Sequence, residues 1–236
     1  TLTFFPPLHA DWSAASLVVK RFTAKSIDAG LENLTVDCET SGAVIFGVQF
    51  EQTMDCWIKS VTVKNCSNYN VHLWHCLNTE VFQAVIGPLL HGGSNGAGLL
   101  HESSCQSLGI DSIIFDSFPN LEWWGGGNMG NAIAYCMMDI TTGAGILGHN
   151  TCDGYTVVEA TPVSSVQLDG YFGPAYRCTF FRNYIFGIRQ GIESGEPVGF
   201  AASVNRTNRY TGFVGNYFAA NPSYGNPNIG NGSSSG

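Results

Sequence analysis

Carboxylate, imidazole and indole side chains recur at similar intervals through the middle of the chain. Glu51, Trp74, His101, Trp124 and His149 follow one another at intervals of 23 to 27 residues. Carboxylates bind hydroxyl groups or calcium, imidazole transfers protons near neutral pH, and indole faces stack on sugar rings. Further residues continue this series or lie beside it: Gln52, His72, His75, Glu102, Glu122, Asp169 and Asn205. The combination is typical of a binding site for an extended carbohydrate.

Within this series His101, Glu102 and Asp169 are the best candidates for catalysis. Glycoside hydrolysis needs two carboxyl groups about 5–10 Å apart, and Glu102 and Glu122 would supply them from neighbouring repeats. A polysaccharide lyase instead needs a base and a cation that neutralises a uronate. Asp169 is the candidate Ca²⁺ ligand, and Arg182 or Arg177 is the candidate base for that reaction. The sequence leaves hydrolase, lyase and non-catalytic binding open.

The same residues also have a structural interpretation. Trp74 and Trp124 would then fold over a corner and pack against a loop, and the histidines and glutamates would be solvated residues of a sheet surface. The chain has no Gly-x-Ser-x-Gly elbow, no P-loop lysine and no EF-hand loop. These absences argue against serine hydrolysis, nucleotide phosphate binding and an EF-hand calcium site.

A short hydrophobic motif positions the polar series. The stretch 31–36 reads apolar, variable, small polar, apolar, variable, apolar, and similar stretches start at 58, 81, 110, 133, 158, 181 and 214. Most intervals are 23 to 29 residues, which is too short for a propeller blade and has no reason to occur in a jelly roll. A second strand-like segment precedes each new start, as at 48–50 and 71–73, and Gly, Asn and Ser clusters mark corners. The pattern predicts an all-β parallel β-helix, a solenoid of about eight coils.

This repeat pattern divides the chain into three parts. Residues 1–30 read as a lead-in or N-terminal cap, residues 31–219 as the β-helix, and residues 220–236 as a flexible tail rich in Gly, Asn and Ser. A cap is expected because the open end of a coil exposes unpaired backbone groups.

The composition limits the partners of the chain. A net charge of −8 with a pI near 5.1 disfavours a nucleic acid or an anionic membrane surface. No apolar run approaches 18 residues, so the sequence predicts no membrane span. Apolar residues make up 44% and charged residues 12% of the chain, which is typical of a folded protein.

The cysteines are informative through their position in the repeat. There are eight, without any Cys-x-x-Cys pair, so a compact zinc module is disfavoured. Cys76 and Cys105 each lie five residues before a repeat start. Equivalent positions stack at about 4.8 Å, which is within disulfide range. A bridge between Cys76 and Cys105 and a stack of small apolar thiols are both compatible with this spacing, and Cys38 and Cys66 are nearly in phase as well.

The chain resembles a known superfamily in its repeat and in three longer stretches. The copies of 31–36, together with 130–135, 165–173 and 178–185, resemble the right-handed parallel β-helix of the pectate-lyase-like superfamily, and in particular a secreted, largely uncharacterised subgroup. The resemblance covers about residues 30–220 and implies a right-handed coil. The Asn-Thr-Asp, Asp-Asp, Gly-His-Gly and Arg-Ile-Lys motifs of polygalacturonases are absent, as is the Trp-Ile-Asp-His motif of pectate lyases. The resemblance therefore assigns no catalytic residue.

Two functions remain open. The first is a secreted, extracellular carbohydrate-active β-helix protein that binds, or binds and cleaves, a polysaccharide along a lateral groove, with Ca²⁺ as the candidate cofactor. The second is a non-catalytic structural or adhesive β-helix, such as a fibre subunit or spike segment, whose end coils stack on further copies.

Overall fold

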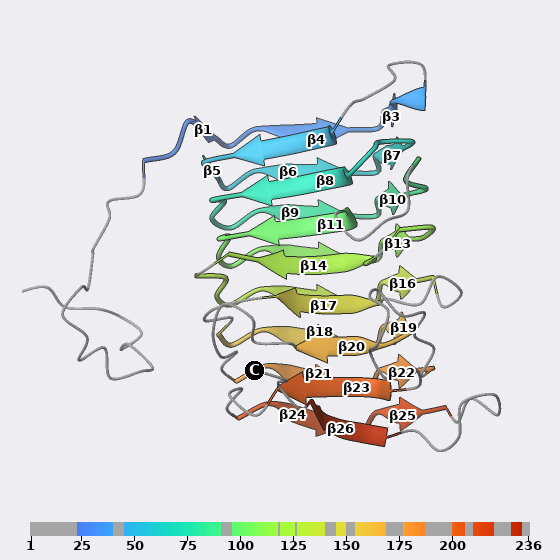
Figure 1. The fold of residues 1–236 in the computed structure, drawn as a ribbon. Helices are drawn as coiled ribbons and strands as arrows, with labels where there is room; N and C mark the ends of the chain where they lie inside the picture. The colour runs from blue at the N-terminus through green and yellow to red at the C-terminus, as the bar shows by residue number, and fades with distance from the viewer. Residues whose placement is uncertain are drawn as a thin grey trace, which may run out of the picture.

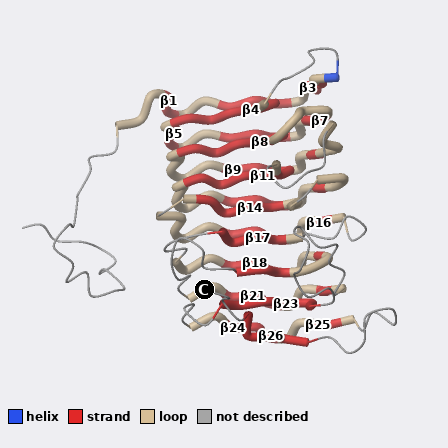
Figure 2. The backbone as a smooth tube through the Cα atoms, in the orientation of Figure 1, coloured by secondary structure: helices blue, strands red, loops and turns tan. Residues whose placement is uncertain are grey.

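The computed structural model describes residues 23–39, 45–90, 96–117, 119–125, 127–139, 145–149, 154–168, 177–186, 200–205, 210–219 and 228–232. These residues form short strands that pair in parallel between successive turns of the chain. Figure 1 shows the turns stacked along one axis, and Figure 2 shows the same stack as rungs of strand joined by short loops. The predicted all-β parallel β-helix is confirmed.

Three sheets run along the axis of the solenoid. The front sheet contains β4 (Phe46–Glu51), β8 (Tyr69–Trp74), β11 (Ala97–Glu102), β14 (Leu121–Trp124), β17 (Ile146–His149), β20 (Val166–Leu168), β23 (Phe200–Asn205) and β26 (Asn228–Gly232). The back sheet contains β2 (Gly30–Glu32), β6 (Trp57–Lys59), β9 (Glu80–Phe82), β12 (Leu108–Ile110), β15 (Ala132–Ala134), β18 (Val157–Glu159), β21 (Thr179–Phe181) and β24 (Gly212–Val214).

The third, or side, sheet is made of two-residue and three-residue strands in two segments. It contains β3 (Thr35–Asp37), β7 (Thr62–Lys64), β10 (Val85–Ile86), β13 (Ile113–Ile114) and β16 (Met137–Met138), followed by β19 (Pro162–Val163), β22 (Tyr184–Ile185) and β25 (Tyr217–Phe218). A further pair, β1 (Ser26–Ile27) with β5 (Thr53–Met54), lies at the corner between the front and back sheets.

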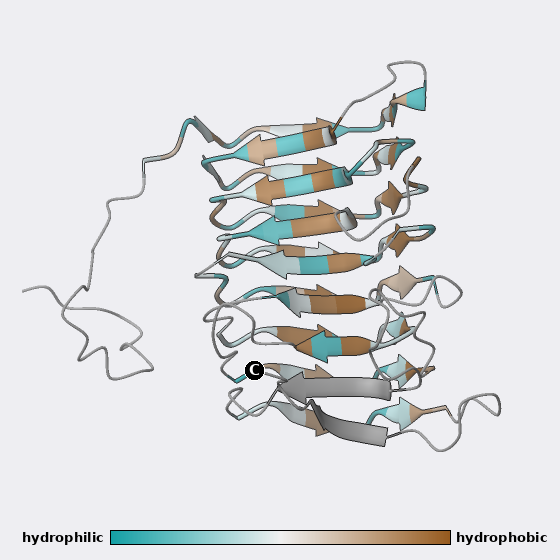
Figure 3. Cartoon of the chain, in the orientation of Figure 1, coloured by the Kyte–Doolittle hydropathy of each residue, from teal (hydrophilic) through white to brown (hydrophobic). Residues whose placement is uncertain are grey.

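The core consists of columns of apolar side chains that point inward from the sheets. On the front sheet Val48, Val71, Leu99 and Leu121 occupy paired positions and are all nearly fully buried. Alternate residues of a strand point to opposite faces, so their neighbours in sequence form columns on the outside. Figure 3 shows the result as hydrophilic bands that cross the hydrophobic strands of the front sheet.

The inward column of the back sheet differs by one residue from the sequence prediction in three coils. It runs through Leu31, Ile58, Val81, Gly109, Ile133, Val158, Phe180 and Phe213. The predicted repeat starts at Ile110, Phe181 and Val214 are therefore one position late. At Gly109 the inward position carries no side chain, and Ile133 Cδ1 lies 2.7 Å from where a Cβ would be. Ile133 of the next coil thus fills the space.

The corner between the back and side sheets is the same in every coil. Two residues separate the strands in each of the pairs β2–β3, β6–β7, β9–β10, β12–β13, β15–β16, β18–β19, β21–β22 and β24–β25. The first of the two has a positive φ each time: Asn33, Ser60, Gln83, Asp111, Tyr135, Ala160, Arg182 and Gly215. The corner between the side and front sheets varies in length, from two residues between β19 and β20 to fourteen between β22 and β23.

Buried amides and hydroxyls connect successive coils at the corners. Asn183 Oδ1 accepts the N–H of Thr161 at 3.0 Å, and its Nδ2 donates to the carbonyl of Val158 at 2.9 Å. Asn216 repeats the arrangement one coil later, with its Oδ1 2.8 Å from the N–H of Asn183. These side chains satisfy backbone groups that the tight turns leave without strand partners.

Both predicted terminal segments contribute strands. β1 and β2 begin at Ser26 and Gly30, inside the predicted lead-in, whereas residues 1–22 lie outside the described residues. Residues 228–232 were predicted to belong to a flexible tail, but they form β26, which pairs in parallel with β23. Residues 228–232 have few apolar side chains, but the backbone groups along the edge of β23 can pair with any strand. Among the described residues, none belongs to a helix that is long and apolar enough to cross a lipid bilayer.

Candidate functional site

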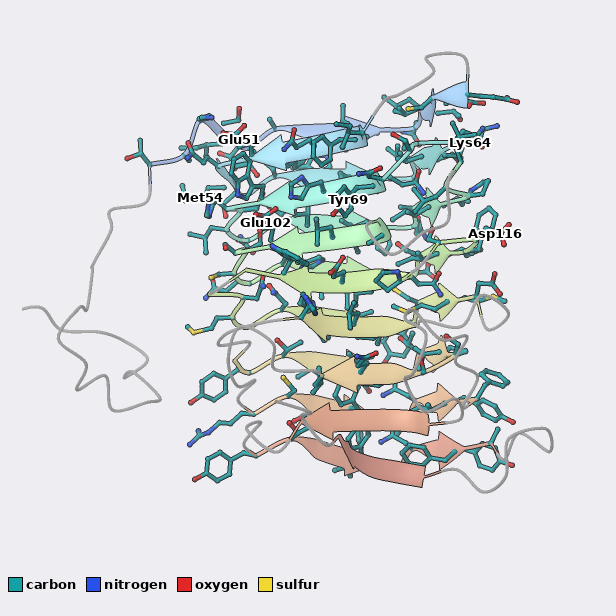
Figure 4. All side chains as sticks on the ribbon, in the orientation of Figure 1. Glu51, Met54, Lys64, Tyr69, Glu102 and Asp116 are labelled. Carbon is teal, nitrogen blue, oxygen red and sulfur yellow. The ribbon has the colours of Figure 1, made fainter. Side chains whose placement is uncertain are left out.

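The outer face of the front sheet carries two adjacent columns of chemically active side chains. One column runs Glu51, Trp74, Glu102, Trp124, His149, and the other runs Gln49, His72, Leu100, Glu122, Leu147, Gln167. Together with Tyr69 at the start of β8, these residues form what we call the front strip. Figure 4 shows Glu51 and Glu102 near one end of the front strands, with Tyr69 farther along the sheet.

His101 does not belong to this strip. It pairs with Leu73 and Trp123, both core residues, and its side chain is fully buried. Burial, and to a lesser extent the nearby His72, lowers the pKa of His101 to about 3. The prediction that His101 acts in catalysis is therefore wrong, because an inward side chain cannot meet a substrate on the outer face. Its place in the outer column is taken by Glu102.

Glu102 is oriented by a hydrogen-bonded histidine. His72 Nε2 lies 2.9 Å from Glu102 Oε2, and His72 Nδ1 lies 3.3 Å from the Nε2 of Gln49. An amide nitrogen only donates, so Nδ1 acts as the acceptor and the ring proton sits on Nε2, from which it is donated to Glu102. His72 is 3% exposed and stacks on Phe46 with ring centroids 4.9 Å apart. The ring is thus held on both edges and on one face.

A second carboxyl group lies diagonally across from Glu102. Glu122 pairs with Leu100, so it is displaced from Glu102 by one strand and two residues. This offset puts their Cα atoms roughly 8 Å apart. Burial raises the pKa of Tyr69 to about 12, and the charges of Glu122 and Glu102 contribute to this shift. The phenol and both carboxyl groups therefore share one electrostatic environment.

Indole and imidazole rings extend the strip along both directions. Trp74 stacks on His75 with ring centroids 5.3 Å apart, and Trp124 stacks on His149 at 4.9 Å. Trp124 is exposed to solvent. At the N-terminal end of the strip, Lys25 forms an ion pair with Glu51. Indole rings are the side chains that stack on sugar rings, and this column carries two of them.

The lyase scheme receives no support from the described residues. Arg182 lies at the corner between the back and side sheets, where it hydrogen-bonds Glu159 at 2.5 Å and covers the ring of Phe181. It does not join the strip on the front sheet. Asp169, the candidate Ca²⁺ ligand, lies outside the described residues. Within the described part of the chain, no group of three or more His, Cys, Asp and Glu side chains is arranged to hold a metal ion.

Of the two alternatives for Cys76 and Cys105, the bridge is not present. Cys105 pairs with Leu77, so the two cysteines are out of register by one residue and point in different directions. Cys76 Sγ lies inside against Thr53 Oγ1 at 3.2 Å, whereas Cys105 Sγ lies 2.9 Å from the carbonyl of Gly127. Both remain thiols.

Sequence reasoning missed the two members of the strip that contact His72. Gln49 and Tyr69 were not selected because amides and phenols are common on any sheet surface. The signal for Gln49 was its phase: it stands one repeat before His72. Tyr69 opens the strand that carries His72, three residues away and close enough for the two rings to contact, at 5.8 Å between centroids.

Comparisons with known proteins support the architecture. No protein-family profile and no curated protein sequence matches the chain. Among solved structures, a mutant of DFA-IIIase from Arthrobacter chlorophenolicus A6 aligns with a TM-score of 0.58 at 10% identity, over 76% of this chain and 45% of that one. The mutant in complex with DFA-III aligns with a TM-score of 0.57 at 10% identity, over 77% and 45%. The chain thus spans less than half the length of these enzymes, and the likeness is one of fold.

Proposed function

We propose that this chain is a carbohydrate-active β-helix protein that binds a glycan along the front strip and hydrolyses a glycosidic bond there. The observation that carries the proposal is the pair Glu102 and Glu122, with one carboxylate already oriented by His72. The fold is shared with DFA-IIIase, a mutant of which has been solved in complex with DFA-III. Trp74 and Trp124 supply the stacking surfaces on either side.

In this proposal the two carboxyl groups have different roles. Glu102 accepts the His72 N–H with one oxygen, so its other oxygen has a fixed direction and is the proposed nucleophile or base. Glu122 is the proposed proton donor to the leaving sugar oxygen. Their diagonal offset is compatible with the carboxyl separations of both retaining and inverting hydrolases, about 5–10 Å.

The charge of the strip favours a neutral glycan. Glu51, Glu102 and Glu122 are acidic, and no Arg or Lys belongs to the strip; Lys25 beside it is already paired with Glu51. A uronate chain would bring like charges together without a compensating cation. Hydrolysis is therefore favoured over lyase chemistry, which acts on uronates.

A digestion screen tests the proposal. Neutral glycans and uronans are incubated with the protein, with and without Ca²⁺, and both reducing ends and unsaturated uronates are followed. We expect reducing ends from a neutral glycan, and a loss of about 10²–10⁴-fold in Glu102→Gln and Glu122→Gln. Glu159→Gln, whose carboxylate pairs with Arg182 at another corner, is the matched control. Unsaturated products, or full activity in both variants, would contradict the proposal.

A second candidate function rests on a different surface. The outward positions of the side sheet form an exposed apolar column: Ile113, Met137, Tyr184 and Tyr217, which are 39–60% exposed. Such a column, together with the edges of β4 and β26, which pair with no further strand among the described residues, would suit a structural protein that associates with further copies. Rods or filaments by electron microscopy, combined with no product on any glycan, would favour this function.

A further inference from the structure

Two cysteines on successive coils bring their sulfur atoms together at the N-terminal end of the solenoid. Cys38 follows β3 and Cys66 follows β7, one coil later. Their Sγ atoms lie 3.4 Å apart, and the backbone N–H of Cys38 donates to the carbonyl of Lys64 at 3.1 Å. The backbones are thus neighbours, and the thiols point toward each other rather than to opposite faces as at Cys76 and Cys105.

The surroundings hold the two thiols in this arrangement. A Cβ atom on Gly47 would lie 2.5 Å from Cys66 Sγ, so β4 packs directly against the sulfur. Next to the thiols, Asp37 forms an ion pair with Lys64 at 2.9 Å and accepts the Asn65 amide at 2.8 Å. Three contacts therefore fix the corner of one coil against the corner of the next.

We propose that Cys38 and Cys66 are a disulfide site that locks the first coil of the solenoid to the second when the protein meets a small-molecule disulfide such as oxidised glutathione. The first coil contains the edge strands of the front, back and side sheets. Within residues 23–232 as far as the structure describes them, this coil has a neighbouring coil on one side only, so it has the most to gain from a covalent link.

The order of the two exchange steps follows from burial. Cys38 is 7% exposed and Cys66 fully buried. The Cys38 thiolate attacks one sulfur of the small disulfide, which forms a mixed disulfide and releases one small thiolate. Cys66, as its thiolate, then attacks the Cys38 sulfur and expels the second small thiolate. The two protein protons end on the two released thiols, so one small disulfide is reduced for each bridge formed.

Cys66 is suited to the second step and not to the first. Burial, followed by the hydrogen bond with Cys38, raises the pKa of Cys66 to about 12. A thiol that is rarely ionised seldom reacts with outside reagents, but it reacts efficiently with a sulfur held beside it. The bridge should therefore form slowly and specifically.

The test is oxidation of the folded full-length protein by glutathione disulfide, followed by non-reducing peptide mapping with mass spectrometry. We expect one cross-linked peptide pair containing Cys38 and Cys66. Cys66→Ser should accumulate glutathione on Cys38, and Cys38→Ser should leave Cys66 unmodified. Cys136→Ser, a buried thiol in contact with backbone carbonyls of Gly109 and Ala134, should close the bridge like the unaltered protein.

A second measurement needs no variant. Limited proteolysis of the oxidised and reduced protein is compared at sites in residues 23–39. We expect cleavage there to slow at least several-fold on oxidation, with little change in the central coils. A glutathione adduct that persists on Cys38 of the unaltered protein, a bridge to any other cysteine, or equal proteolysis of the two forms would overturn the proposal.

Discussion

His101 and Glu102 are neighbours in the chain and point to opposite faces of the front sheet. One is buried in the core with a strongly lowered pKa, and the other is half-buried on the outer strip, where it accepts a hydrogen bond from His72. The sequence suggested both as chemically active, because either residue fits the repeat within one position. A shift of one residue exchanges the two faces of a strand, so composition alone could not separate them.

The burial of His101 predicts a pH dependence of stability. Its pKa is about 3 in the folded protein and about 6.5 when unfolded, so only the unfolded state takes up the proton between these values. Stability is complete above about pH 6.5 and falls by about 1.4 kcal/mol per pH unit below it. His101→Leu should remove about 2 kcal/mol of the difference between pH 7 and pH 5. Urea unfolding at both values measures this.

Two features make this test specific. His101 Nδ1 and Nε2 make no hydrogen bond within the described structure, so leucine leaves no new orphaned group at this position. The control is His75→Gln, at an exposed corner. If His101→Leu leaves the pH dependence of the free energy of unfolding unchanged, other groups cause the loss of stability in acid. The same conclusion holds if the control loses as much of that pH dependence as His101→Leu does.

A second prediction at this scale concerns Gln49, whose amide fixes the tautomer of His72. Gln49→Leu removes the donor to Nδ1, so the proton should redistribute between the two ring nitrogens and the orientation of Glu102 should relax. Nitrogen NMR of the labelled histidine reports the tautomer whether or not a substrate is known. On an active substrate, kcat/KM should fall roughly 3- to 10-fold. Gln167→Leu, in the same column five strands away, should leave the tautomer of His72 unchanged.

At the scale of elements, the two-residue corner between the back and side sheets sets the geometry of every coil. Its first residue has a left-handed conformation in all eight copies, although only Gly215 is a glycine. The remaining seven copies carry the steric cost of a Cβ atom in that region. The repeat in the sequence predicted a corner here, but not its conformation, because Asn, Ser, Gln, Asp, Tyr, Ala and Arg share no turn signature.

This cost is measurable by exchanging alanine and glycine within one column. Ala160 has φ 48° and Gly215 φ 64°, and a Cβ on Gly215 would touch only Arg182 Cγ at an ordinary 3.6 Å. Ala160→Gly should stabilise and Gly215→Ala destabilise the protein, by about 0.5–1 kcal/mol each, after allowing for the entropy of the unfolded chain. Chemical unfolding measures both. Ala132→Gly, within strand β15, should destabilise, and stabilisation there would refute the conformational explanation.

For the whole molecule, the period of the hydrophobic motif was sufficient to predict the fold, since few architectures repeat every 23 to 29 residues. The sequence also predicted that the candidate site is a column of side chains on one sheet. It did not predict which residue of each strand belongs to that column. The strand register makes Glu102 the central carboxylate of the site and adds Gln49 and Tyr69 to it. Arg182 does not belong to the site, because it lies at another corner. Register depends on details such as the empty inward position at Gly109, which Ile133 fills from the next coil.

A stack of coils should also open from its ends. Phe213 and Phe218 in the last described coil of the back and side sheets are only partly buried, whereas Ile58 and Ile133 are fully buried. Amides of β24 and β25 should exchange with deuterium faster than those of β12 and β13, on the order of 100-fold or more. Exchange followed by mass spectrometry measures this. A single uniform rate would mean that the solenoid opens as one cooperative unit.

The back-to-side corner has a constant length and the side-to-front corner a variable one, and this difference decides where insertions in the chain can be tolerated. A one-residue insertion at the back-to-side corner would turn every later side chain in that strand to the wrong face. The side-to-front corner already ranges from two to fourteen residues between strands, and it opens directly onto the strands that carry the front strip. New loops can be grafted at that one corner, coil by coil, to reshape the border of the strip while the columns of the core keep their register.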